Sequence, residues 1–192
     1  MRRAFFLVAL LVGVLSMASA SVVDFNSYTP LDDYSAPVVS TGGLDFSLLS
    51  GGPFLSVWDG SSPNGNGTPA LIFSNFTPGE IAITRTGGGS FDLNSFDMSI
   101  SWYDGDSSTT VNVTEFPVVG LPQTLTLSQG LQTYSLNLSG VTQVNVTGML
   151  SGSGYWVMDN VTYNATPEPA SLALAGFGLI AVAVRFRRRK AA

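Results

Sequence analysis

Cysteine and histidine are both absent from the 192 residues of this sequence. Their absence excludes disulfides, zinc sites built from Cys and His, c-type haem attachment, and catalysis by Cys–His or Ser–His–Asp groups. Any domain in this chain must therefore be held together by packing, with or without a bound metal ion.

Basic residues are scarce away from the two ends of the chain. Residues 21–166 contain one, Arg85, against twelve acidic residues, so this part has a net charge of −11 while the whole chain has −5. Nucleic-acid binding needs clustered Lys and Arg, and the composition argues against it. An acidic surface of this kind fits a soluble extracellular domain or one that binds cations.

The first 20 residues have the three-part pattern of a secretory signal peptide. A positively charged start precedes an apolar run, and Ala18 and Ala20 form the small-residue pattern that signal peptidase cleaves. We expect export through the secretion translocon and cleavage before Ser21. The exported domain then covers residues 21–163.

The C-terminal segment, residues 167–192, also has three parts. Pro167, Glu168 and Pro169 come first, and an apolar run over residues 170–184 follows. A basic cluster comes next, made of Arg185, Arg187, Arg188, Arg189 and Lys190. As a helix the run measures roughly 22 Å, short of a bilayer core of about 30 Å, and the basic cluster keeps its end cytoplasmic. These features alone fit a C-terminal membrane anchor joined to the domain by a linker at 164–166.

The order of motif, apolar run and basic cluster resembles the PEP-CTERM sorting signal of Gram-negative bacteria. The resemblance implies recognition and cleavage by exosortase, a membrane enzyme, after transient anchoring in the inner membrane. It further implies that the exported part ends at the cell surface or in the extracellular matrix of bacteria that make exopolysaccharide.

Alternation of apolar and polar residues dominates the exported domain. Residues 96–102, 110–114 and 134–138 alternate with period two, which is typical of half-buried strands. Further strands are expected at 22–25, 44–49, 55–58, 70–73, 81–86, 123–127, 143–146 and 155–163. Gly-rich turns separate these segments and no long stretch has a helical period. The pattern predicts an all-β antiparallel sandwich, in a jelly-roll form rather than an immunoglobulin-like one.

The last of these strands, at 155–163, carries Asp159 at the same parity as apolar residues. A buried carboxylate is costly unless it is paired or bound to a cation, and calcium takes several hard oxygen ligands. The segment resembles the closing Asp-Asn-Val strand of jelly-roll carbohydrate-binding modules and galactose-binding-like domains. That resemblance implies a structural Ca²⁺ between the first and last strands, held by Asp24, Asn26 and Asp159. The alternative is that a bulge turns Asp159 to solvent, or that Asp159 caps a turn.

Aromatic residues are the candidates for sugar binding, because sugar rings stack on them. Parity places Trp102 in the core but sets Tyr103 and Trp156 opposite to their apolar neighbours, so we expect these two to form an exposed platform. The loop over residues 59–68 is rich in Asp, Asn and Gly. Its spacing does not fit an EF-hand, and a polar hairpin loop is the favoured interpretation.

The sequence therefore predicts a non-catalytic surface or matrix protein that associates with extracellular polysaccharide or serves structurally. The alternative is a secreted glycan-active hydrolase. Such an enzyme needs two carboxylates facing each other across a cleft, and nothing in the sequence selects a pair among the acidic residues.

Overall fold

The computed structural model describes residues 20–28, 38–50, 54–59, 66–75, 79–100, 108–149 and 154–165, together with positions 176 and 178. Ala20–Ala165 forms one compact unit. The signal peptide before Ala20, the Pro-Glu-Pro motif, the basic cluster and Tyr103 lie outside the described residues. Within the described ranges, no helix is both long and apolar enough to cross a membrane.

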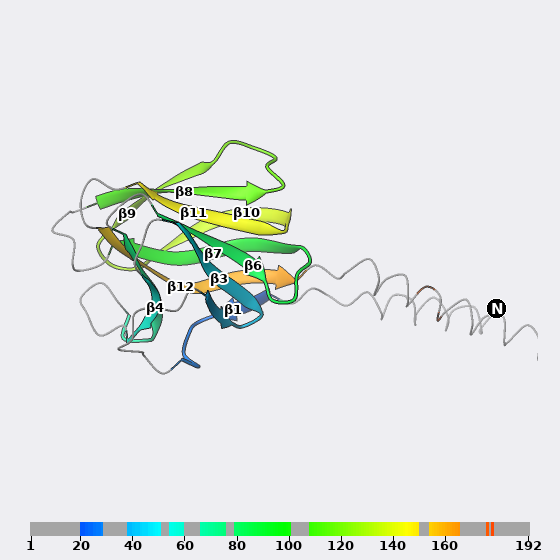
Figure 1. Cartoon of the computed structure of the whole chain (residues 1–192), viewed down its shortest axis with the longest axis horizontal. Helices are drawn as coiled ribbons and strands as arrows, with labels where there is room; N and C mark the ends of the chain where they lie inside the picture. The colour runs from blue at the N-terminus through cyan, green and yellow to red at the C-terminus, as the bar shows by residue number, and fades with distance from the viewer. Residues whose placement is uncertain are drawn as a thin grey trace, which may run out of the picture. The chain divides into compact units, whose positions relative to one another are not determined.

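Two antiparallel sheets make up the compact unit (Figure 1). Sheet A contains β1 (Ala20–Val23), β4 (Phe54–Trp58), β5 (Ala70–Asn75), β7 (Phe91–Ile100), β10 (Gln132–Val141) and β12 (Gly154–Ala165). Sheet B contains β2 (Val38–Thr41), β3 (Leu44–Ser50), β6 (Glu80–Arg85), β8 (Ser108–Phe116), β9 (Gln123–Ser128) and β11 (Gln143–Met149).

The order of strands confirms the predicted all-β, jelly-roll-like sandwich. Sheet A runs β10-β7-β12-β5-β4, with β1 added beside β12, and sheet B runs β2-β3-β6-β11-β8-β9. Most connections cross from one sheet to the other, and only β2–β3, β4–β5 and β8–β9 are hairpins between neighbours. Strand β12 continues through Asn164 and Ala165, two residues that were expected in the linker.

Strand β2 is the one described strand that the alternation did not predict. It is short, and it is held in place by its hairpin with β3, whose two-residue loop is Gly42-Gly43. Both glycines have positive φ, 57° and 85°, as the tight turn between twisted antiparallel strands requires. The Tyr163 hydroxyl of β12 donates a 2.7 Å hydrogen bond to the Gly42 carbonyl, which fastens this hairpin to sheet A.

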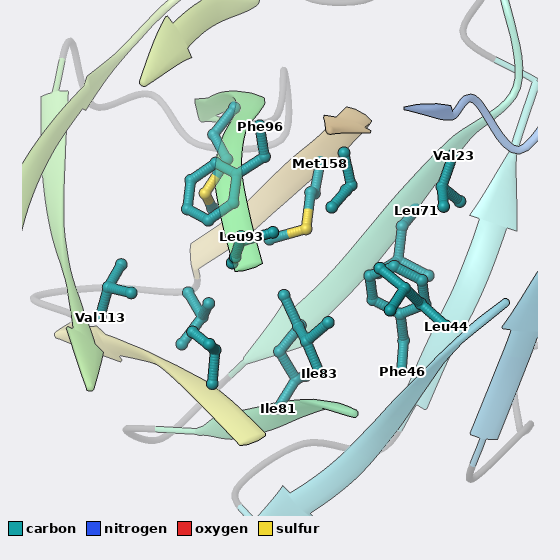
Figure 2. Packing of buried hydrophobic residues seen from close by; sticks show 14 of the residues in the cluster. Val23, Leu44, Phe46, Leu71, Ile81, Ile83, Leu93, Phe96, Val113 and Met158 are labelled. Carbon is teal, nitrogen blue, oxygen red and sulfur yellow. The ribbon is translucent and has the colours of Figure 1, made fainter. Parts of the chain in front are cut away.

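Apolar side chains from both sheets fill the space between them (Figure 2). Phe46, Ile81 and Ile83 of sheet B face Leu71 and Met158 of sheet A, and all five are fully buried. A second, smaller apolar cluster lies on the other face of sheet A. Some residues on this outer face of sheet A are therefore buried as well. The same face carries the polar side chains of the candidate site.

The two edge strands of sheet B, β2 and β9, contain no charged residue, and a tyrosine hydroxyl bonds to backbone groups of each. Tyr28 donates to the Ser40 carbonyl on β2 at 2.6 Å and accepts from the Ser40 amide at 3.1 Å. Tyr134 donates to the Thr126 carbonyl on β9 at 2.7 Å, and burial raises the pKa of Tyr134. Unpaired strand edges invite pairing with other chains, so these bonds protect edges that lack the usual charges.

Candidate functional site

A single extra residue in β12 sets the geometry of the candidate site. Asn160 has a φ of 48°, and the pairing of β12 with β7 shifts register between Asp159 and Thr162. Such a bulge reverses the alternation on its two sides. Trp156 and Met158 therefore face the core together with Val161, whereas Asp159 lies on the outer face of sheet A.

The expected aromatic platform is wrong at Trp156. This side chain is 0% exposed and packs in the core against Phe73, with ring centroids 5.0 Å apart. The bulge at Asn160 is the physical reason, because it inverts the parity on which the prediction depended. Tyr103, the other member of the platform, lies outside the described residues.

Cross-strand pairing lines up five residues across the outer face of sheet A. Trp58 pairs with Ala70, Asp159 pairs with Asp97, and Asp97 pairs with Thr133. Because Met158 pairs with Leu71, Asp159 is next to Ala70 along β12 and β5. The row therefore runs Trp58, Ala70, Asp159, Asp97, Thr133, from an aromatic ring to two carboxylates and a hydroxyl.

Asp159 is fully buried in this row and accepts three hydrogen bonds. The Asn160 amide donates to Oδ1 at 2.8 Å, while Asn66 Nδ2 and Thr68 Oγ1 donate to Oδ2 at 2.9 and 3.3 Å. Burial raises the pKa of Asp159 above its ordinary value, and the nearby charge of Asp97 adds to that rise. The three hydrogen bonds act in the opposite direction, because they favour the ionised carboxylate.

Asn160 connects the two carboxylates. Its backbone N–H donates to Asp159, as described above, while its side-chain Nδ2 donates to Asp97 Oδ2 at 2.8 Å. Thr133 Oγ1 donates to the other oxygen of Asp97, Oδ1, at 2.6 Å. Asn66 and Thr68, at the end of the loop over residues 59–68, thus bond to Asp159. The sequence had favoured a polar hairpin loop there, without such a contact. Sequence reasoning missed Asp97 and Thr133, whose only signal is a solvent-facing parity within their strands.

The predicted calcium ligands make separate local contacts. The exposed Asp24 carboxylate accepts from its near neighbour Asn26, through the backbone amide at 3.2 Å and through Nδ2 at 2.9 Å. Asp159 accepts instead from the donors described above. Over the described ranges, no three Asp or Glu residues form a group that could hold a metal ion.

An apolar cluster adjoins the polar row on the same face. Ala70, Ile72 and Val157 are buried, and the half-buried Trp58 and Leu131 pack against them. Trp58 therefore packs against aliphatic residues and stays partly exposed. A half-buried ring near hydrogen-bonding groups can offer a ligand stacking and polar contacts together.

A comparison with protein-family models bears on how the chain is sorted. Residues 165–189 match the PEP-CTERM protein-sorting motif. The PEP-CTERM match confirms the resemblance drawn from Pro167, Glu168 and Pro169, and it indicates an exported protein that is sorted to the cell surface. A comparison with curated proteins finds no match.

Several solved structures are similar to the sandwich. An exo-β-agarase has a TM-score of 0.49 and 14% identity over 78% of this chain, which spans 26% of the agarase chain. The family 29 carbohydrate-binding module CBM29_1 from Piromyces equi has a TM-score of 0.48 and 11% identity, covering 77% of this chain and 91% of the module. A variant of CBM29-2 has a TM-score of 0.45 and 15% identity, covering 77% and 93%.

Proposed function

We propose that this chain is a non-catalytic surface protein, sorted by exosortase, whose sheet A binds neutral polysaccharide of the envelope or extracellular matrix. The observation that carries the glycan part is the half-buried Trp58 at the end of a row of hydrogen-bonding side chains. The observation that carries the sorting part is the PEP-CTERM match.

The proposed path begins with the translocon and signal peptidase at the N-terminus. The apolar run at 170–184 then holds the chain in the inner membrane, with the basic cluster on the cytoplasmic side. Exosortase cleaves near the Pro-Glu-Pro motif, and the sandwich is released to the surface or matrix. The short length of the run supports a temporary anchor, because mismatch with the bilayer weakens its hold.

The charge of the exported part favours a neutral glycan. Residues 21–166 carry a net charge of −11, so an acidic polysaccharide would be repelled. The polar groups of the row that a sugar can reach are the half-buried Asp97 carboxylate and the exposed Thr133 hydroxyl, which match the hydroxyls of sugars as acceptor and donor. Stacking of a sugar ring on Trp58 supplies the apolar part of the contact.

The hydrolase alternative would use Asp97 and Asp159, two carboxylates that pair across β7 and β12. Asp159 is 0% exposed and its oxygens are taken by three donors, so a substrate cannot reach it without rearrangement. This burial supports a binding role over catalysis. Release of reducing sugar by the chain, lost in Asp97→Asn, would support the hydrolase instead.

We also propose a structural Ca²⁺ between the first strand and the last. The predicted set of Asp24, Asn26 and Asp159 contains only hard oxygen donors, as calcium prefers. The oxygens of Asp24 and Asp159 already accept protein hydrogen bonds, so a calcium ion would replace those contacts rather than enter a preformed cage. The net negative charge around Asp159 is what supports a cation there.

The glycan proposal is tested by binding of the full chain to neutral polysaccharides and to one polyuronic acid. We expect binding to a neutral polymer that is lost in Trp58→Ala and largely kept in Trp58→Phe. Phe116→Ala removes a half-buried ring from sheet B and serves as the matched control. Equal binding by Trp58→Ala and the unchanged chain, or binding to the polyuronic acid alone, would overturn the proposal.

A further inference from the structure

One loop holds the three most exposed large apolar side chains of the described residues. It spans residues 117–122, between β8 and β9, and we name it the apolar loop. Val118 is 60% exposed, Val119 82% and Leu121 93%. No charged residue occurs from Phe116 to Ser128. Exposed aliphatic side chains gathered in one uncharged segment mark a contact surface more often than isolated ones do.

The apolar loop lies at the end of the sandwich where the chain leaves for its sorting segment. Its first residue follows Phe116, whose carbonyl accepts from the Thr142 amide at 2.8 Å and from Thr142 Oγ1 at 3.2 Å. Val141, next to Thr142, pairs with Phe91, and Phe91 pairs with Ala165 at the end of β12. The arrowheads of β8 and β12 accordingly point the same way in Figure 1.

Chain length then limits how far this end can be from a membrane. Residues 166–169 alone separate Ala165 from the apolar run at 170–184, a reach of at most about 17 Å when extended. Three steps of about 5 Å, from Ala165 to Phe91, from Phe91 to Val141 and from Thr142 to Phe116, place the start of the apolar loop within roughly 20 Å of Ala165. An anchored run therefore holds the apolar loop close to the bilayer surface.

We propose that the apolar loop inserts its aliphatic side chains into the outer surface of the inner membrane while the chain is anchored. This inference rests on the membrane stage of the proposed function. The contact gives the domain a second attachment and orients the end of β12, and thereby the Pro-Glu-Pro motif, at the bilayer surface where a membrane enzyme acts.

A lipid surface fits the apolar loop better than a second copy of the chain does. Two exported domains would each bring a net charge of −11, and their mutual repulsion opposes self-association. The acyl boundary of a zwitterionic bilayer accepts aliphatic side chains without any counter-charge. The insertion is therefore expected in zwitterionic vesicles and to be insensitive to salt.

The absence of native cysteine makes the test direct, because one introduced thiol can be labelled alone. Three variants of the full chain, Val119→Cys, Leu49→Cys and Ala181→Cys, carry a polarity-sensitive fluorophore in phosphatidylcholine vesicles that contain quencher-labelled lipid. Leu49 is the matched control, an aliphatic residue 49% exposed near the far end of β3. Ala181 reports insertion of the apolar run.

We expect a blue shift and lipid quenching at positions 181 and 119, and neither effect at position 49. Leu121→Asp in the Val119→Cys chain should abolish quenching at 119 and leave quenching at 181 unchanged. Quenching at 181 without quenching at 119 overturns this inference and leaves the membrane stage standing. Absence of quenching at 181 refutes the membrane stage, and the inference with it. A blue shift at 119 without lipid quenching shows a protein contact and also overturns the inference.

Discussion

Replacing Asp159 by alanine removes the acceptor for three hydrogen bonds on the outer face of sheet A. The Asn160 amide is half-buried and loses its partner, and one buried donor left unmet costs about 1–3 kcal/mol. Asn66 is exposed, so water replaces its lost acceptor at little cost. Part of the penalty is offset because a desolvated charge also disappears. We expect a net loss of about 2 kcal/mol at neutral pH, which lowers Tm by about 4–8 °C for a domain of this size.

Asp159→Asn separates the charge from the hydrogen bonds. The folded-state pKa of Asp159 is raised, so the folded protein holds this proton more tightly than the unfolded chain does. Protonation of Asp159 therefore stabilises the folded state. This stabilisation is complete below the pKa of the unfolded chain, near 3.8, and is lost as pH rises through the pKa of the folded state. The asparagine variant cannot titrate there, so its stability relative to the unchanged chain should rise with pH across that window.

The assay is urea unfolding of residues 20–165, the compact unit, at a series of pH values from below 3.8 to neutral. We expect the unfolding free energy of the asparagine variant to rise with pH relative to that of the unchanged domain. A difference that stays constant, or that falls as pH rises, would refute the assignment of a desolvated carboxylate.

Three further predictions concern the core, the β2–β3 hairpin and calcium. Trp156→Ala should cost about 3–5 kcal/mol in urea unfolding as a cavity opens in the core, whereas Trp156→Phe should cost far less, because the buried indole N–H has no hydrogen-bond partner among the described residues. Equal losses would contradict this placement. Gly43→Ala and Gly88→Ala both put a side chain at positive φ, 85° and 87°, but only the first meets the Tyr163 hydroxyl, so its Tm should fall further. Calcium should raise the Tm of the unchanged chain and not of Asp159→Asn, and a rise in both would place any bound ion elsewhere.

The fold was largely predictable because half-buried strands leave a local mark. Residues such as Phe96, Met98 and Ile100 alternate with polar ones, and the structure buries all three. Strand β2 left no such mark, because the exposed Val38 stands beside the buried Val39 and its four residues therefore do not alternate. The order of strands within each sheet depends on contacts distant in sequence, which alternation alone does not encode.

The candidate site was less predictable because it depends on one bulge. Assigning faces to 155–163 by strict period two put Trp156 outside, and the extra residue Asn160 reversed that assignment. Asn tolerates positive φ better than most residues, so the Asp-Asn pair was a weak local signal. The pairing of Asp97 with Asp159 depends on register between strands more than fifty residues apart, and no short-range pattern predicts it.

We expect the chain to be exported and its C-terminal motif to direct its processing. The most direct measurement is the intact mass of the chain recovered from outside cells of a host that has exosortase, compared with a variant in which Pro167 and Pro169 are alanine. We expect an extracellular product that lacks the first 20 residues and the apolar run with its basic cluster. The variant should stay with the membrane and keep the C-terminal segment. An unprocessed chain outside the cells, or the same processed mass in both chains, would show that this motif does not direct processing.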